Sequence, residues 1–308
     1  MKNAIHTPVD LAFETFGRPS DPCLVLLHGA AMQLVDWPSA LLERLSRGFF
    51  LLVFDLRDSG ASTKCGPCND SGFATRWSDL TNGTGPIATY NLFDMADDVI
   101  RSLDRLGVVR AHFVGYSMGG MIAQILAARH GDRTLSLTSL MSSAGQAGID
   151  CSAGVRRALV DAFTPFADLE HSVAELSQSY RAYYGAGQRA DRDDIAERIR
   201  RAYRRCYCPN GVLRQLLAIQ QTGARQDLLR GIDCPTLVVH GSEDACIDVA
   251  WAEAMSSVIP DCDFRVIPGL GHEFTDQSTS LIARLVAEHC GAAERSRPQL
   301  LDGGKAYV

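Results

Sequence analysis

The segment "VGYSMGG" (residues 114–120) contains the residue pattern in this chain that is best suited to chemistry. Gly115-x-Ser117-x-Gly119 has the spacing of a nucleophile elbow, a turn so tight that glycines must flank the serine. An apolar run precedes the motif and a helical pattern follows it, so the strand–turn–helix setting is present. Ser117 is therefore predicted to be a nucleophile at a strand end, facing the positive N-terminus of a helix.

A serine hydroxyl is a weak nucleophile and needs a base, which in turn needs an orienting acid. The expected chain order is serine, acid, histidine. Asp244 follows the apolar run "TLVV", and His272 lies in the glycine-containing loop "PGLGHEF" after the next run. Both residues thus follow strands, as Ser117 does, at the end of the sheet where open α/β proteins bind ligands. The competing acids are Glu243, Asp248 and Asp276, of which Asp248 is expected to cap a helix.

Stabilising a tetrahedral oxyanion requires two backbone N–H groups. One is expected from Met118, directly after the serine, and the other from Ala30 in "LLHGAAMQ" (residues 26–33). His28 is expected to organise that loop by hydrogen bonding. A second loop-locking network is expected from Asp55, Arg57, Asp58 and Gly60. A substrate contact of Arg57 is the alternative.

Alternating elements must position these residues. Apolar runs of strand length occupy residues 23–29, 49–55, 111–117, 136–142, 235–241 and 263–269, and amphipathic helical patterns occupy 39–47, 92–107, 118–130, 248–257 and 277–290. Such alternation predicts an α/β fold with a mostly parallel sheet and helices on both faces. Residues 9–17 could add an antiparallel edge strand.

The alternation is interrupted between residues 143 and 231, where helical patterns rich in Arg, Ala and Tyr predict an inserted helical cap. The core is then expected to comprise residues 1–142 and 232–290, with a flexible tail over 291–308. Residues 62–90, rich in Gly, Asn, Ser and Thr, predict a long surface loop.

Composition limits the classes of partner. The net charge of −6 and pI near 5.7 argue against nucleic acid, and no apolar run is long enough to span a membrane. The N-terminal residues lack the apolar stretch of a signal peptide, so the ten cysteines are expected to be free thiols in the cytoplasm. The sequence leaves the oligomeric state open.

Cys65-Gly66-Pro67-Cys68 has the letters of a thioredoxin-type redox motif. Such a motif needs a helix directly after it, which would lower the thiol pKa, and no helical pattern follows here. A plain Gly-Pro turn is the preferred interpretation. A regulatory disulfide is one alternative, and a zinc site with Cys206 and Cys208 is another, although nothing in the sequence brings the two pairs together.

Taken together, "LLHGAAM", "FDLRDSGAST", "VGYSMGG", "HGSEDACI" and "PGLGHEF" resemble the α/β-hydrolase fold family over residues 20–290. Within it the chain resembles the aclacinomycin methylesterase-like group of actinobacterial hydrolases. The resemblance implies hydrolysis of a carboxylic ester without a cofactor or metal. One departure from this group is the missing proline in "ACIDV". The other is a longer segment at 64–90, which can reshape the pocket mouth and so change the substrate.

The substrate is expected to be a small molecule of apolar or aromatic character, held by aromatic side chains. The pocket candidates are Trp37, Tyr180, Tyr183 and Tyr184, with Phe163, Phe166, Tyr203 and Tyr207 as further cap aromatics. The arginines at 198–205 are expected on a solvated helix face, with an anion site as the alternative. A lactonase, a carbon–carbon bond hydrolase, and a ligand-binding or cyclase-like protein remain open functions.

Overall fold

The computed structural model describes residues 9–69, 89–145, 151–188 and 191–296. Its centre is a seven-stranded sheet with the order β1-β3-β2-β4-β5-β6-β7. The strands are β1 (Phe13–Phe16), β2 (Cys23–Leu27), β3 (Phe50–Phe54), β4 (Ala111–Tyr116), β5 (Thr134–Leu140), β6 (Thr236–Gly241) and β7 (Cys262–Ile267). All neighbouring pairs are parallel except β1 with β3, so the six predicted strands and the antiparallel edge strand are confirmed.

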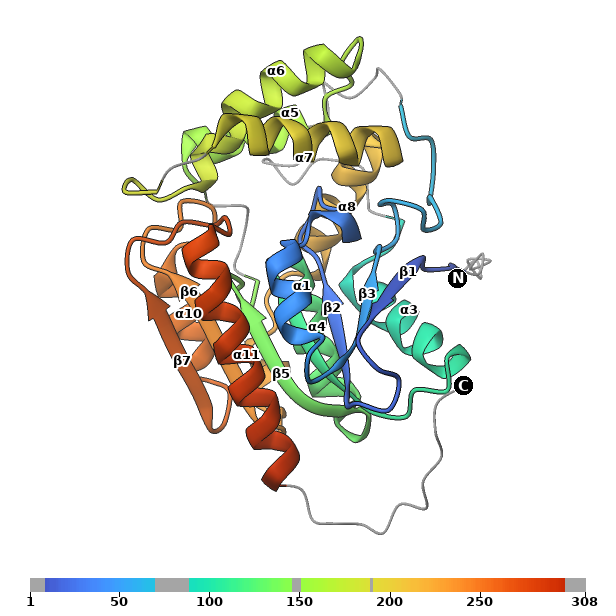
Figure 1. Cartoon of the computed structure of the whole chain (residues 1–308), viewed down its shortest axis with the longest axis vertical. Coiled ribbons are helices and arrows are strands. Elements are labelled where there is room, and N and C mark those ends of the chain that lie inside the picture. The colour runs from blue at the N-terminus through green and yellow to red at the C-terminus, as the bar shows by residue number, and fades with distance from the viewer. Residues whose placement is uncertain (1–8, 70–88, 146–150, 189–190, 297–308) are drawn as a thin grey trace.

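Helices cover both faces of this sheet, which explains why every residue of β2, β4, β5 and β6 is buried. Apolar residues of α1 (Ser39–Leu45) and α11 (Asp276–Ser296) pack together on one face, as Figure 1 shows in front of the sheet. On the other face lie α3 (Leu92–Arg105), α4 (Met118–Arg129) and α10 (Val249–Ser256). Short 3₁₀ helices occupy Leu34–Asp36 (η1), Gly131–Arg133 (η3) and Tyr180–Tyr183 (η4).

Between β5 and β6 the chain forms the predicted helical insertion. Its members α5 (Ala153–Phe163), α6 (Leu169–Ser179), α7 (Arg192–Arg205) and α8 (Pro209–Thr222), here called the cap helices, lie across the end of the sheet (Figure 1). They have two small apolar cores of their own. The next helix, α9 (Gln226–Leu229), already contributes Leu229 to the main core, so the core resumes before the expected boundary at 231.

Two expected boundaries fall on or near residues outside the described ranges. Of the predicted loop 62–90, residues 70–88 are not described, and of the predicted tail, residues 297–308 are not described. Residues 291–296 are not a tail, because α11 continues through them to Ser296 and buries Ala293. Within the described ranges, no helix combines the length and the apolar character needed to cross a membrane.

Candidate active site

Ser117 occupies the turn between β4 and α4 in a backbone conformation that side chains rarely adopt, with φ 53° and ψ −118°. The flanking glycines are required by close packing. A Cβ on Gly115 would lie 2.1 Å from the Gly119 carbonyl oxygen, and a Cβ on Gly119 would lie 1.9 Å from that of Leu27. The predicted elbow therefore has a steric cause. It presents the Ser117 side chain above the carboxyl end of β4.

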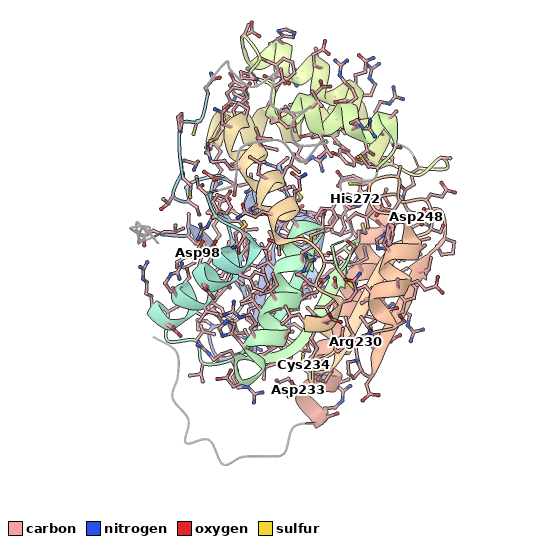
Figure 2. All side chains as sticks on the ribbon, turned by 180° about the vertical axis from the view of Figure 1, so that it is seen from behind. Asp98, Arg230, Asp233, Cys234, Asp248 and His272 are labelled. Carbon is pink, nitrogen blue, oxygen red and sulfur yellow. The ribbon has the colours of Figure 1, made fainter. Side chains whose placement is uncertain are left out.

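Ser117, His272 and Asp244 form one chain of hydrogen bonds. The Nε2 atom of His272 lies 3.1 Å from Ser117 Oγ, and its Nδ1 atom lies 2.7 Å from Asp244 Oδ2. Figure 2 shows His272 at the end of the core that faces the cap helices, with Asp233 and Cys234 at the opposite end. Strands β4, β6 and β7 thus bring together three residues that are far apart in sequence, in the order that the motifs predict.

Of the candidate acids, Asp244 is the one whose carboxylate contacts His272, and backbone donors hold it in place. Oδ1 accepts hydrogen bonds from the backbone N–H groups of Cys246 and Ile247, both at 2.8 Å. Of the competing acids, Asp248 caps α10 as predicted, Glu243 binds the N–H of a cap residue, and Asp276 begins α11 in an exposed position.

Burial and neighbouring charges have opposite effects on the pKa values of Asp244 and His272. Burial disfavours the ionised form of Asp244, but the charge and hydrogen bonds of His272 and His240 outweigh it and lower the Asp244 pKa. Burial likewise opposes protonation of His272, yet the neighbouring Asp244 raises the His272 pKa well above its ordinary value. The carboxylate consequently stabilises an imidazolium on His272, which a general base forms when it accepts a proton.

His240 is a site residue that the sequence reasoning missed. It is fully buried on β6, and its Nε2 atom lies 3.1 Å from Asp244 Oδ2 and 2.8 Å from the Ile247 carbonyl oxygen. Because a carbonyl only accepts, Nε2 carries a proton and can also donate toward Asp244. The spacing "HGSED", with histidine four residues before the acid, was the available signal.

The loop after β2 lies against the elbow. A Cβ on Gly29 would be 3.2 Å from the Ser117 Cβ, and Ala30 lines the cavity beside it. Met118 is the first residue of α4, where backbone N–H groups have no partner within the helix. Both expected oxyanion donors therefore belong to segments adjoining Ser117.

His28 organises this loop, as expected. Its Nδ1 atom is 2.7 Å from the Gly29 carbonyl oxygen, while its Nε2 atom accepts from the Leu56 N–H at 3.0 Å. These partners fix the Nδ1–H tautomer. Burial lowers the His28 pKa, which favours that neutral form.

The predicted network of the second loop is present. Asp55 accepts from the Leu34 and Ala61 N–H groups and pairs with Arg205 at 2.6 Å. Arg57 forms a buried ion pair with Asp98 at 2.6 Å and lies outside the described cavity lining, which favours its structural role over a substrate contact. The carboxylate of Asp58 binds the Arg214 guanidinium and the Tyr90 and Cys65 donors.

A cavity of about 290 Å³ opens above Ser117 between the core and the cap helices. Ser117 and His272 both line it, so the two ends of their hydrogen bond face this cavity. Its aromatic wall consists of Tyr116, Tyr180, Tyr183, Tyr203, Tyr207 and Trp251. A polar part of the wall is formed by Gln33, Asp36, Arg198, Gln215 and Glu273. Such a mixture suits an apolar or aromatic molecule with a few polar groups.

Two of the four predicted pocket aromatics are placed elsewhere. Trp37 is only 3% exposed and packs against Tyr116 and Phe274 in the core below, outside the described lining. Tyr184 packs against the α6–α7 core of the cap and is also absent from that lining. Tyr180 and Tyr183 do line the cavity. The sequence could not separate these cases because each is an aromatic residue near a loop.

The arginines at 198–205 form the expected solvated face only in part, because Arg201 and Arg204 are exposed whereas Arg198 and Arg205 bind acids of the core. Arg198 lines the cavity and pairs with Glu273 at 2.9 Å; burial opposes its charge, but Glu273 raises its pKa. Arg201 donates to the Val35 carbonyl at 2.7 Å, and Arg205 pairs with Asp55. Three arginines thus join α7 to the core, whereas Arg200 pairs with an acid of α6.

The cysteine pairs prove to be neighbours. Asn210 N–H donates to the Cys68 carbonyl at 3.1 Å, and burial together with a hydrogen bond from the Cys208 thiol to Cys68 raises the Cys208 pKa to about 12. Burial also raises the pKa of Cys65 and Cys206. A thioredoxin-type site needs the opposite shift. Within the described ranges, no group of three or more His, Cys, Asp or Glu is arranged to hold a metal ion.

Comparison with known proteins agrees with this geometry. The model of the alpha/beta hydrolase fold family matches residues 22–278. Rhodomycin D methylesterase of Streptomyces peucetius is 24% identical over 92% of this chain and 96% of its own length. The 3-oxoadipate enol-lactonase 2 of Acinetobacter baylyi is 24% identical over 84% of this chain and 85% of its own.

Among solved structures, a thermophilic esterase from Thermogutta terrifontis superposes with a TM-score of 0.67 at 25% identity, covering 94% of this chain and 96% of the esterase. An enol-lactonase from Burkholderia xenovorans superposes with a TM-score of 0.71 at 20% identity, covering 92% of this chain and 97% of the lactonase. The expected resemblance to an actinobacterial methylesterase is also confirmed by the Streptomyces relative. From the elbow at Ser117, the order of the strands and the family match, it follows that this chain belongs to the α/β-hydrolase fold family.

Proposed function

We propose that this α/β-hydrolase cleaves carboxylic esters through a Ser117–His272–Asp244 catalytic triad and an acyl-enzyme. The observation that carries the proposal is the continuous hydrogen-bond chain from Asp244 through His272 to Ser117, which ends in an aromatic-lined cavity. A nucleophile, a base and an orienting acid within hydrogen-bond reach are what acyl transfer requires.

In the first half of the reaction, His272 Nε2 takes the Ser117 proton while Oγ attacks the ester carbonyl carbon. Asp244 holds the imidazole in the tautomer with a proton on Nδ1 and stabilises the imidazolium that forms. The Ala30 and Met118 N–H groups donate to the developing oxyanion. The carbon–oxygen bond to the alcohol then breaks, and His272 returns its proton to the departing alkoxide.

In the second half, a water molecule attacks the acyl carbon of the Ser117 ester. His272 accepts a proton from this water, and the same two N–H groups stabilise the second oxyanion. Collapse of the intermediate releases the carboxylic acid and returns the proton to Ser117 Oγ. The steps use only side chains, backbone N–H groups and water.

The acyl part of the substrate is proposed to be apolar or aromatic, with a small alcohol such as methanol. Tyr180 and Tyr183 offer ring surfaces to such a group, and Arg198 and Glu273 supply polar contacts at one part of the wall. The likeness to a methylesterase supports a methyl ester of an aromatic or polyketide-type metabolite.

Lactone hydrolysis is the second candidate, favoured by the likeness to an enol-lactonase. The same serine would open the ring, and the departing alcohol would stay attached to the acid, giving one product instead of two. Among the described residues that line the cavity, none favours a carbon–carbon bond hydrolase, or a ligand-binding or cyclase-like protein on this scaffold.

Two measurements test the proposal. A fluorophosphonate probe should label wild-type protein, and Ser117→Ala should lose both labelling and turnover while unfolding at the same temperature. Turnover of matched aryl methyl esters and aryl lactones would then separate the two candidates. Absence of labelling in the wild type would favour a binding protein, and near-wild-type turnover by Ser117→Ala would exclude Ser117 as the nucleophile.

A further inference from the structure

Gln215 of the cap helix α8 joins two loops of the core, the loop after β2 that adjoins Ser117 and the loop after β3. Its Oε1 atom accepts from the Ala31 N–H at 3.3 Å, and its Nε2 atom donates to the Arg57 carbonyl oxygen at 2.9 Å. The side chain is only 1% exposed and lines the cavity. Both ends of one buried amide are therefore used to connect the cap to the core.

Ala31 has a backbone conformation that needs support. Its φ of 63° lies in the left-handed region, which is unfavourable for an alanine and easily reached by a glycine. Ala31 directly follows Ala30, the residue proposed to donate to the oxyanion. A change in the Ala31 conformation would move the Ala30–Ala31 peptide and, through the Ala30 Cα atom, shift the Gly29–Ala30 peptide that carries the Ala30 N–H group.

The far end of the same loop is also fixed by the cap. Gln33 Nε2 donates to the carbonyl oxygens of Ala202 at 2.7 Å and Cys206 at 2.9 Å, at the end of α7. Its Oε1 atom accepts from Arg205 at 3.0 Å. The loop is consequently fixed at one end by α7 and beside Ala30 by α8.

We infer that Gln215 is a positioning residue for the oxyanion hole, so that docking of the cap sets the geometry of transition-state stabilisation. This inference rests on the proposed ester hydrolysis at Ser117. Gln215 acts through the loop of residues 30–33 and not on the substrate carbonyl. The cap is then part of the machinery that stabilises the oxyanion, in addition to forming the pocket wall.

Loss of Gln215 should raise the free energy of the transition state more than that of the bound substrate. Oxyanion donors act only when they lie at hydrogen-bond distance from the tetrahedral oxygen, and small displacements reduce the rate strongly. Gln215 also lines the cavity, but both polar ends of its side chain are bonded to the core, so ground-state binding is expected to depend mainly on the aromatic wall. A loss of kcat with little change in KM is therefore expected.

The test compares Gln215→Met, which removes both hydrogen bonds, with Gln221→Met, the same change at an exposed position of α8. Gln215→Met should lower kcat by about tenfold or more and change KM by less than about threefold. Gln221→Met should match the wild type. Gln215→Asn keeps the amide but is one methylene shorter, so it should show the same loss and serves if the methionine variant does not fold.

The affinities for two inhibitors distinguish a role in the oxyanion hole from a merely structural role. An aryl trifluoromethyl ketone forms a tetrahedral adduct with Ser117, whereas the matching aryl methyl ketone mimics the ground state. Gln215→Met should weaken the first inhibitor by the same factor as kcat and leave the second unchanged. Equal weakening of both inhibitors would overturn the inference.

Rescue by Ala31→Gly gives an independent check. Glycine adopts the left-handed conformation without the steric penalty, so Ala31→Gly should restore part of the activity lost in Gln215→Met. A double variant no better than Gln215→Met would contradict the inference, and so would unchanged kcat in every Gln215 variant. Failure of the proposed function would look different, because the wild type would then not turn over esters at all.

Discussion

The backbone N–H of His272 donates to the carbonyl oxygen of Tyr183 at 2.6 Å, so a residue of the insertion holds the loop that carries the proposed base. The Gly271 N–H next to it donates to the Gln188 side chain at 3.1 Å. Together with the contacts of Gln215 and Gln33, these bonds connect the insertion to both loops that adjoin Ser117. The insertion and the reactive residues are therefore one structural unit.

The close approach of these segments predicts that Gly271→Ala will impair the enzyme. A Cβ at this position would lie 2.3 Å from the Tyr183 carbonyl oxygen, so one of the two backbones must move. We expect a loss of about 1–3 kcal/mol in unfolding free energy and at least a tenfold lower kcat/KM. Denaturant unfolding and steady-state kinetics measure both.

Gly48→Ala is the matched control, because nothing lies within 4 Å of a Cβ there. Its stability should stay within about 0.5 kcal/mol of the wild type. If Gly271→Ala has the same unfolding free energy and kcat/KM as Gly48→Ala, the contact between the insertion and the loop that carries His272 is not needed for function.

The raised pKa of His272 predicts the pH dependence of hydrolysis. A general base acts in its neutral form, so kcat/KM should be low where His272 is protonated and rise with pH. The inflection should lie above 6.5, because Asp244 stabilises the imidazolium more than burial destabilises it.

Asp244→Asn removes that negative charge at nearly constant shape. The inflection should move to lower pH, and kcat should fall on the order of 10⁴-fold because the imidazole loses its orienting acid. The pH profile of kcat/KM for an aryl ester measures both effects. An inflection that stays in place would show that Asp244 does not control His272.

His240 is predicted to hold Asp244 in place. His240→Met removes its donor, and a hydrogen bond to a charged group contributes about 1.5 kcal/mol, so kcat/KM should fall roughly tenfold. His240→Gln can place an N–H near the same position and should retain most of the activity. The comparison is made at the pH plateau of each variant, and equal loss in both would point to packing instead.

Substitution of Trp37 is predicted to affect mainly stability, and substitution of Tyr180 mainly KM. Trp37→Leu leaves space in the core and should lower the unfolding free energy by about 3 kcal/mol without changing KM for an aryl ester. Tyr180→Leu removes part of the cavity wall and should raise KM several-fold with a smaller loss of stability. A KM increase from Trp37→Leu at full stability would place that residue at the substrate after all.

Much of the site was readable from the sequence because its chemistry is encoded locally. The steric demands of the elbow fix Gly115, Ser117 and Gly119 within five residues, and apolar runs mark the strands that place Asp244 and His272 at the same end of the sheet. The edge strand, the inserted helices and the capping role of Asp248 likewise follow from short patterns. Each depends only on backbone geometry and on neighbours in sequence.

What the sequence alone determined, therefore, is the order of elements and which three residues the structure joins in one hydrogen-bond chain. Only the tertiary structure decided that Trp37 lies in the core, that Arg198 and Arg205 pair with core acids, that Cys68 lies beside Cys208, and that Gln215 contacts Ala31. These features depend on which face of each cap helix meets the core. That choice is made by packing and by burial of ion pairs between segments over 60 residues apart, and no local pattern records it.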